Sequence, residues 1–145
     1  MVELLVVVVV ISSLLALSIP RFRNTFNNLR FDNFCQDLAA RMRYLNERAS
    51  FEQNIYRMNF DFVQGKIEIA FKENFYEEFK KGGRRLEKDM IIPDGVKIQI
   101  EKPSILFYPD GTIEGKNIYI TGFNNKVNLI INNTIGRITL IKDEQ

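Results

Sequence analysis

Glu3 is the residue whose chemistry most needs an explanation, because it lies near the start of an almost continuous apolar run, residues 2–19. An ionised side chain in such a run costs up to ~3 kcal/mol in a membrane, depending on its depth. The nearest cation is Arg21, about four to five helical turns further along a helix. Either Glu3 lies among lipid headgroups, or it needs a positive partner from another chain, and we take the second reading as the hypothesis.

Residues 2–19 are expected to form a membrane-spanning helix. As a helix they would rise roughly 27 Å, about the hydrocarbon thickness of a bilayer. A secretory signal peptide would have a basic start and a small-x-small cleavage site, and neither is obvious. Pro20 follows directly, and a proline inside a helix removes one backbone hydrogen bond, so a kink is expected there.

The apolar periodicity continues beyond Pro20 at helical spacing, which predicts an amphipathic helix over residues 22–53. Its opposite face is charged and typical of a solvated surface. With the first segment it would form one helix of about 50 residues. The expected core stripe consists of Phe22, Phe26, Leu29, Phe34, Leu38, Met42, Leu45 and Ala49.

Residues 54–145 are expected to form a β-rich globular domain, because the apolar period changes from 3.6 to 2 after Ser50. Turn sequences such as Pro93-Asp94-Gly95 and Pro109-Asp110-Gly111 separate short strands at spacings typical of antiparallel sheets. The charged residues 73–85 read as an exposed excursion. The predicted strands are 55–62, 66–71, 96–100, 105–108, 117–121, 126–131 and 137–141. The predicted fold class is α+β, with residues 1–21 as transmembrane and assembly segment, 22–53 as amphipathic half-helix and 54–145 as domain.

Catalytic chemistry is not indicated, so we expect no enzyme, no cofactor and no metal site. The 145 residues contain no histidine and one cysteine, Cys35, so the commonest general base is missing and no disulfide can form within the chain. Ser104 and Thr112 have no histidine partner, and turn chemistry accounts for Asp94 and Asp110. The net charge of +2 excludes polyanion binding by bulk electrostatics.

One basic cluster remains open to two interpretations. Lys80, Lys81, Arg84 and Arg85 could hold phosphate or anionic lipid, or they could simply keep a loop soluble, which we favour.

The N-terminal sequence VELLVVVVVISSLLALSIPRF resembles the signature of type IV pilins and of type II secretion pseudopilins, including the interval between Glu3 and Pro20. The remainder is similar to the GspH/FimT group of minor pseudopilins and minor pilins. The segments that carry this likeness are DLAARMRYLNERA, ILFYPDGTIEG and IGRITLI, which fall in the family's order. The resemblance implies a pilin-like fold, in which a long N-terminal helix packs on antiparallel sheets.

The resemblance also implies a function. The chain would be a structural minor subunit of a type II secretion pseudopilus or a type IV pilus, in which Glu3 pairs with the N-terminal amine of a neighbouring subunit. Its partners would be other pilin or pseudopilin subunits, the inner membrane, an assembly platform and a prepilin peptidase. The family's leader peptide and the two residues before the position of Met1 are absent, so we expect a truncated chain or a start assigned within the signature. Peptidase cleavage and N-methylation therefore map to no residue here.

The orientation in the membrane is open. The family places its C-terminal domain in the periplasm or on the filament surface, anchored by a single pass through the bacterial inner membrane. Arg21, Arg23 and Arg30 follow the apolar run and would keep the domain in the cytoplasm by the positive-inside rule, unless basic residues of a leader outweigh them.

A DNA-binding minor pilin for natural transformation is the alternative function. It would use Arg137 together with the Lys80–Arg85 cluster. DNA-binding members of the group carry a second arginine soon after the Gly-Arg pair near the C-terminus, whereas this chain has Gly136-Arg137-Ile138-Thr139. The threonine weakens a nucleic-acid role.

Overall fold

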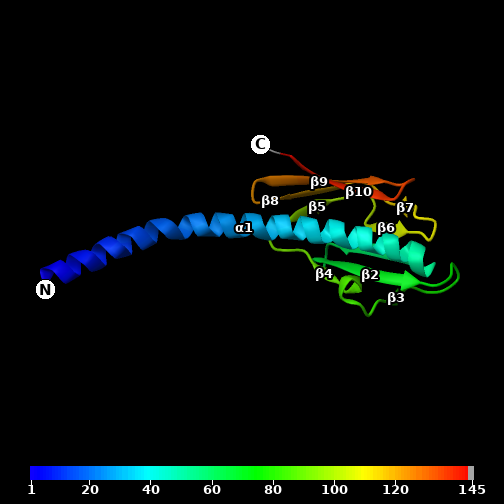
Figure 1. The fold of residues 1–145 in the computed structure, drawn as a ribbon, viewed down its shortest axis with the longest axis horizontal. Coiled ribbons are helices and arrows are strands. Elements are labelled where there is room, and N and C mark those ends of the chain that lie inside the picture. Colours follow the sequence, from blue (N-terminus) through cyan, green and yellow to red (C-terminus); the bar gives the residue numbers. More distant parts are fainter. Residues whose placement is uncertain (144–145) are drawn as a thin grey trace.

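The computed structural model describes the backbone of residues 1–143 and the side chains of residues 1–14 and 25–143. One long helix, α1 (Val2–Glu52), runs from the N-terminus along the whole β domain (Figure 1). The helix ends because Gln53 adopts the left-handed conformation, with φ 56° and ψ 33°. The side-chain amide of Gln53 donates to the Ser50 carbonyl at 2.7 Å and caps the last turn.

Ten strands form two antiparallel sheets. The first sheet has the order β3-β2-β1-β6-β7, with β4 also paired to β2, and the second has the order β10-β9-β8-β5. The bounds in the first sheet are β1 (Ile55–Asp61), β2 (Lys66–Lys72), β3 (Lys80–Lys81), β4 (Met90–Ile91), β6 (Ser104–Phe107) and β7 (Ile113–Glu114). Those in the second sheet are β5 (Lys97–Gln99), β8 (Ile118–Gly122), β9 (Asn125–Asn132) and β10 (Arg137–Asp143). A short 3-10 helix, η1 (Arg85–Glu87), precedes β4. The predicted α+β architecture is confirmed.

All seven predicted strands are present, but the prediction missed β3, β4 and β7. Each of these has two residues, too few to show an alternating pattern. The predicted excursion is therefore only partly correct: residues 73–79 leave the sheet, and Lys80 and Lys81 return to it opposite Phe71 and Ala70.

The buried stripe of α1 begins later than predicted. Phe26 and Leu29 are 61% and 55% exposed, and Phe31 is the first fully buried residue among the side chains that the structure describes. The reason is the position of the domain: the β8–β9 hairpin first meets the helix here, and a Cβ on Gly122 would lie 3.1 Å from the Phe31 ring. Phe22 lies outside the described side chains. From Phe31 onward the buried residues are Phe34, Cys35, Leu38, Ala39, Met42, Leu45 and Ala49.

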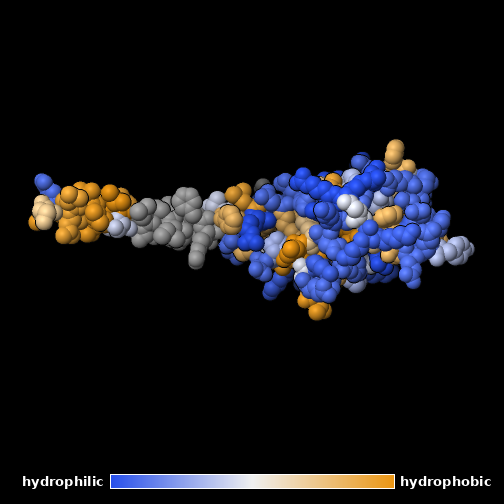
Figure 2. Space-filling view, turned by 90° about the horizontal axis from the view of Figure 1, so that it is seen from below, coloured by the Kyte–Doolittle hydropathy of each residue, from blue (hydrophilic) through white to orange (hydrophobic). Residues whose placement is uncertain are grey.

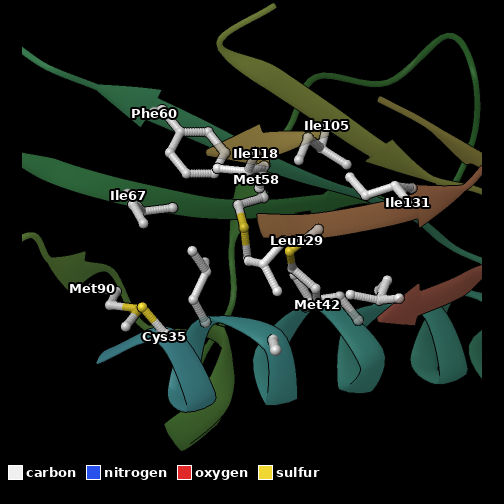
Figure 3. Packing of buried hydrophobic residues seen from close by; sticks show 14 of the residues in the cluster. Cys35, Met42, Met58, Phe60, Ile67, Met90, Ile105, Ile118, Leu129 and Ile131 are labelled. Atoms are coloured by element: carbon white, nitrogen blue, oxygen red, sulfur yellow. The ribbon is translucent and has the colours of Figure 1, made fainter. Parts of the chain in front are cut away.

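The core lies where this stripe meets the inner faces of both sheets. Met42 of α1, Met58 of β1 and Leu129 of β9 point toward one another in Figure 3, and all three are fully buried. Met90 of β4 closes the N-terminal end of the core beside Cys35. Because helix and sheets share one apolar cluster, they hold each other in a fixed arrangement.

Polar contacts also fasten the domain to α1. Arg43 donates through Nε and Nη2 to the Ile138 carbonyl of β10, at 3.2 and 3.1 Å. Nζ of Lys142 lies 2.9 Å from Oδ2 of Asp32. On the other side, Nη1 of Arg41 donates to the Lys88 carbonyl at 2.8 Å. The second half of α1 is thus held by the domain on both sides.

Within the described part of the chain, none of the helices combines the length and apolar character needed to cross a membrane. The span predicted for residues 2–19 includes residues 15–19, whose side chains lie outside the description.

Candidate assembly surface

The N-terminal turns of α1 form an exposed apolar rod, which we call the assembly segment (residues 2–14). Its large apolar side chains are between 51% and 76% exposed. Figure 2 shows this segment as a largely hydrophobic projection away from the domain. Soluble monomers rarely expose apolar patches of this size, and such patches mark sites where another molecule binds.

The sequence of the assembly segment makes an isolated helix in water marginal. Residues 6–10 are five consecutive valines, and β-branched side chains lose rotamer freedom against the preceding helical turn. Most helical stability in proteins comes from packing of an apolar face rather than from propensity. The segment therefore gains stability from neighbours that cover it.

Two serines lie in the segment without breaking its apolar surface. The Ser12 hydroxyl donates to the Val8 carbonyl at 2.7 Å, and the Ser13 hydroxyl donates to the Val9 carbonyl. Each hydroxyl is satisfied inside its own helix, four residues back. Small side chains of this kind allow a second helix to approach closely.

Glu3 occupies the first turn of α1 and is exposed. A carboxylate at this end of a helix is favoured by the partial positive charge of the free backbone N–H groups. Glu3 forms no ion pair with any residue whose side chain is described. A neighbour that buried this helix would therefore have to supply a cation or leave the charge uncompensated.

The kink predicted at Pro20 concerns a residue outside the described side chains. After the gap, the apolar surface continues at Phe26 and Leu29, both exposed. The Arg30 guanidinium lies 5.9 Å from the centroid of the Phe26 ring. Exposed apolar side chains are thus described both in the assembly segment and just before the point where the domain begins to cover the helix.

The predicted basic cluster is largely neutralised by acids. Nζ of Lys80 lies 3.4 Å from Glu77, and Nζ of Lys81 lies 2.8 Å from Asp89, whose pKa the lysine lowers. Nη1 of Arg84 lies 2.6 Å from Oε1 of Glu52 at the end of α1. Sequence reasoning missed the Arg84–Glu52 pair because Glu52 lies 32 residues away and approaches only through the fold. It also overlooked the two acids that are near in sequence, Glu77 and Asp89. These pairs favour a structural role for the cluster over an anion site.

Arg85 and Arg137 are exposed but lie apart. Arg85 begins η1, whereas Arg137 begins β10, the outer strand of the second sheet. In Figure 1, β10 lies on one side of α1 and β3, with Lys80 and Lys81, lies on the other. The structure does not bring Arg137 and the Lys80–Arg85 cluster together into one surface.

Comparison with known proteins identifies the fold. No family model matches the chain, and no curated protein matches it. Two solved structures of the minor pseudopilin EpsH from the type II secretion system of Vibrio cholerae are similar, each at 12% sequence identity. The first has a TM-score of 0.66 over 77% of this chain and 96% of EpsH, and the second 0.58 over 77% and 93%. The likeness confirms the predicted pilin-like fold.

Proposed function

We propose that this chain is a structural subunit of a type II secretion pseudopilus or a related type IV pilus, and that it assembles through residues 2–14. The observation that carries the proposal is the combination of a pseudopilin-like fold with a projecting helix whose apolar side chains are half to three-quarters exposed. When several such helices pack into a bundle, the β domains fixed to their ends can lie around that bundle. The proposed position is that of a minor subunit.

Burial of the rods drives assembly in this account. Complete burial of a Val, Leu or Ile side chain contributes about 1.5–3 kcal/mol relative to exposure, and nearly every residue from Val2 to Ile11 has area to bury. The serines permit close helix contact. The β domains, each already folded around its own α1, then form the outer surface of the filament.

Glu3 sets the register between neighbouring rods. Packing the rods takes its carboxylate away from water, and an isolated buried charge is costly. A cation from a neighbouring subunit relieves this cost only when the two helices are offset so that the charges meet. The family resemblance implies that this cation is the N-terminal amine of the neighbouring subunit.

The remaining parts of the proposal follow from the same role. Before assembly, the rod would be held in the bacterial inner membrane with the β domain in the periplasm. An assembly platform and a prepilin peptidase would be its further partners. We propose no catalytic step, because the chain acts by packing.

Replacement of Glu3 tests the proposed function. In cells lacking the wild-type copy, Glu3→Leu should leave the chain in the membrane fraction and remove it from sheared filaments. Glu47→Leu is the matched control, since Glu47 is an exposed glutamate on the part of α1 that carries the domain, and it should assemble normally. Normal assembly of Glu3→Leu would contradict the role given to Glu3.

A further inference from the structure

Two exposed surfaces on opposite sides of the core carry aromatic or apolar side chains together with opposite charges. We call the first the acidic loop (residues 73–78, between β2 and β3). We call the second the basic face, the outward side of the β10-β9-β8-β5 sheet. In Figure 1, β9 and β10 lie above α1, and β2 and β3 lie below it. The basic face includes Lys97, Tyr119, Lys126, Ile130, Arg137 and Ile141, and it also carries Asp143, which lies opposite Lys126.

The acidic loop is held in one conformation with its aromatic residues outward. The Phe75 ring stacks on Tyr108 with centroids 6.4 Å apart, and Nζ of Lys72 donates to the Phe75 carbonyl at 3.0 Å. The backbone N–H of Glu77 donates to the Asn74 carbonyl at 3.2 Å. Even so, Phe75 is 69% exposed and Tyr76 is fully exposed. A loop ordered before binding loses little conformational freedom on docking.

The basic face presents apolar side chains where an alternating strand would normally place polar ones. Tyr119 of β8 and Ile141 of β10 both lie opposite Asn128 of β9 in the strand register. Tyr119 is 48% exposed, Ile141 42% and Ile130 39%. The strand neighbours of Tyr119 and Ile130 are buried in the core, so Tyr119 and Ile130, together with Ile141, form a second apolar band that faces solvent.

The charges around the two surfaces are complementary and unpaired. Glu73 and Glu78 flank the aromatic residues of the acidic loop. On the basic face, Lys97, Lys126 and Arg137 lie around the apolar band and outnumber its acid, Asp143, which lies opposite Lys126. Among residues with described side chains, none of these six enters an ion pair. Complementary potentials steer two surfaces together and fix their register.

We propose that the acidic loop of one subunit docks on the basic face of a second copy of this chain. The inference rests on the proposed function, and adds that copies occupy neighbouring positions in the filament. Because the two surfaces differ and lie on opposite sides of the core, the contact is head-to-tail, so each added subunit offers a fresh surface to the next. Tyr76 enters the apolar band between Tyr119 and Ile141, and the glutamates face the cations around it. The β domains thereby make a lateral contact separate from that of the helices.

Paired cysteines in the full-length chain test the contact. If the contact is head-to-tail, Tyr76→Cys alone and Ile130→Cys alone should each stay monomeric on oxidation. Cells that express both single variants should give a disulfide-linked dimer. A chain that carries both substitutions should give a ladder of dimers, trimers and larger adducts. Adducts from either single variant would indicate a symmetric contact and overturn the inference. The wild-type chain, with only the buried Cys35, gives the background.

Val7→Cys separates failure of this contact from failure of the proposed function. If Val7→Cys forms adducts while the Tyr76/Ile130 pair does not, the filament role stands and the lateral contact is wrong. If neither forms adducts, both are wrong.

A charge exchange provides the second measurement. Glu78→Arg or Arg137→Glu, placed in the cysteine background, should each reduce the cross-linked fraction at least about threefold, and the two together should restore it. Lys102→Glu lies outside both surfaces and should leave the fraction unchanged. Should Arg137→Glu abolish retention of duplex DNA while leaving the cross-link intact, the basic face would bind nucleic acid instead and the inference would fall.

Discussion

The hydroxyl of Tyr56, in the first strand, donates a 2.6 Å hydrogen bond to Oε2 of Glu52, in the last turn of α1. The other carboxylate oxygen of Glu52 lies 2.6 Å from Nη1 of Arg84 and 3.2 Å from Nη2 of Arg48. Nη1 of Arg84 also reaches the buried Glu87 at 3.2 Å. The end of the long helix is therefore tied to β1 and to η1 through one carboxylate.

The contacts of the Glu52 carboxylate predict that acid destabilises the fold. The Tyr56 hydrogen bond, aided by both arginines, lowers the pKa of Glu52 below its ordinary value of 4.5. A lowered pKa in the folded state gives stability that is present above pH 4.5 and lost as the pH falls through the folded-state value. Glu52→Gln should lower the free energy of unfolding by about 1 kcal/mol at pH 7 and flatten its decline below pH 4.5. Urea titrations of the wild type, Glu52→Gln and the control Glu47→Gln across pH 3–7 would measure this. The same pH dependence of the free energy of unfolding in all three proteins would contradict it.

The start of the buried stripe predicts a contrast between two phenylalanines. Phe31→Ala should destabilise the domain by about 3–5 kcal/mol, because it leaves a cavity beneath the β8–β9 hairpin. Phe26→Ala should change the free energy of unfolding by no more than about 0.5 kcal/mol. Denaturant titration in detergent measures both, and equal effects would place the beginning of the core elsewhere.

Alanine substitutions at two glycines with positive φ can distinguish the cost of backbone strain from the cost of steric overlap. Gly65, in the β1–β2 turn, has open space where a Cβ would be, whereas a Cβ on Gly136 would overlap the Gly111 carbonyl oxygen and the Asn46 amide. Gly65→Ala should cost about 1 kcal/mol from the left-handed conformation alone. Gly136→Ala should cost at least about 2 kcal/mol, since overlap is added to strain. The difference between their urea midpoints measures the steric part; a larger loss for Gly65→Ala would contradict the packing described.

Cys35 should serve as an internal reporter of unfolding. Burial, with Asp32 nearby, raises the pKa of its thiol to about 12. At pH 8 the thiolate fraction falls about 1,000-fold relative to a thiol with a pKa of 9. Alkylation by iodoacetamide should therefore be at least about 100-fold slower in the native protein than in urea. Rapid native labelling would show that the helix separates from the β domain.

Periodicity in the sequence was enough to predict one long helix, seven strands and their antiparallel arrangement. It was not enough to locate where the helix becomes covered, because Phe26 and Leu29 continue the apolar spacing with no partner domain beside them. A helical pattern shows which face can be buried, and tertiary contact decides how far along the helix burial extends.

The residues of the candidate site were predictable from the sequence, but their partners were not. Glu3 stands out from sequence alone, since a charge in an apolar run requires compensation, but the partner proposed for it belongs to another chain. The basic residues of the Lys80–Arg85 cluster were easy to find and their pairing was not, because Glu52 reaches Arg84 only through the fold. The fold is similar to that of EpsH at only 12% identity, because a fold depends on the volume and pattern of its core more than on individual residues.

Cross-linking within the assembly segment tests the central claim most directly. Val7→Cys, expressed as the sole copy in cells that assemble filaments, should on oxidation give adducts of two or more chains in the sheared filament fraction. Adding Glu3→Leu to Val7→Cys should remove those adducts. A chain recovered only as monomer, with filaments assembling normally around it, would contradict the account.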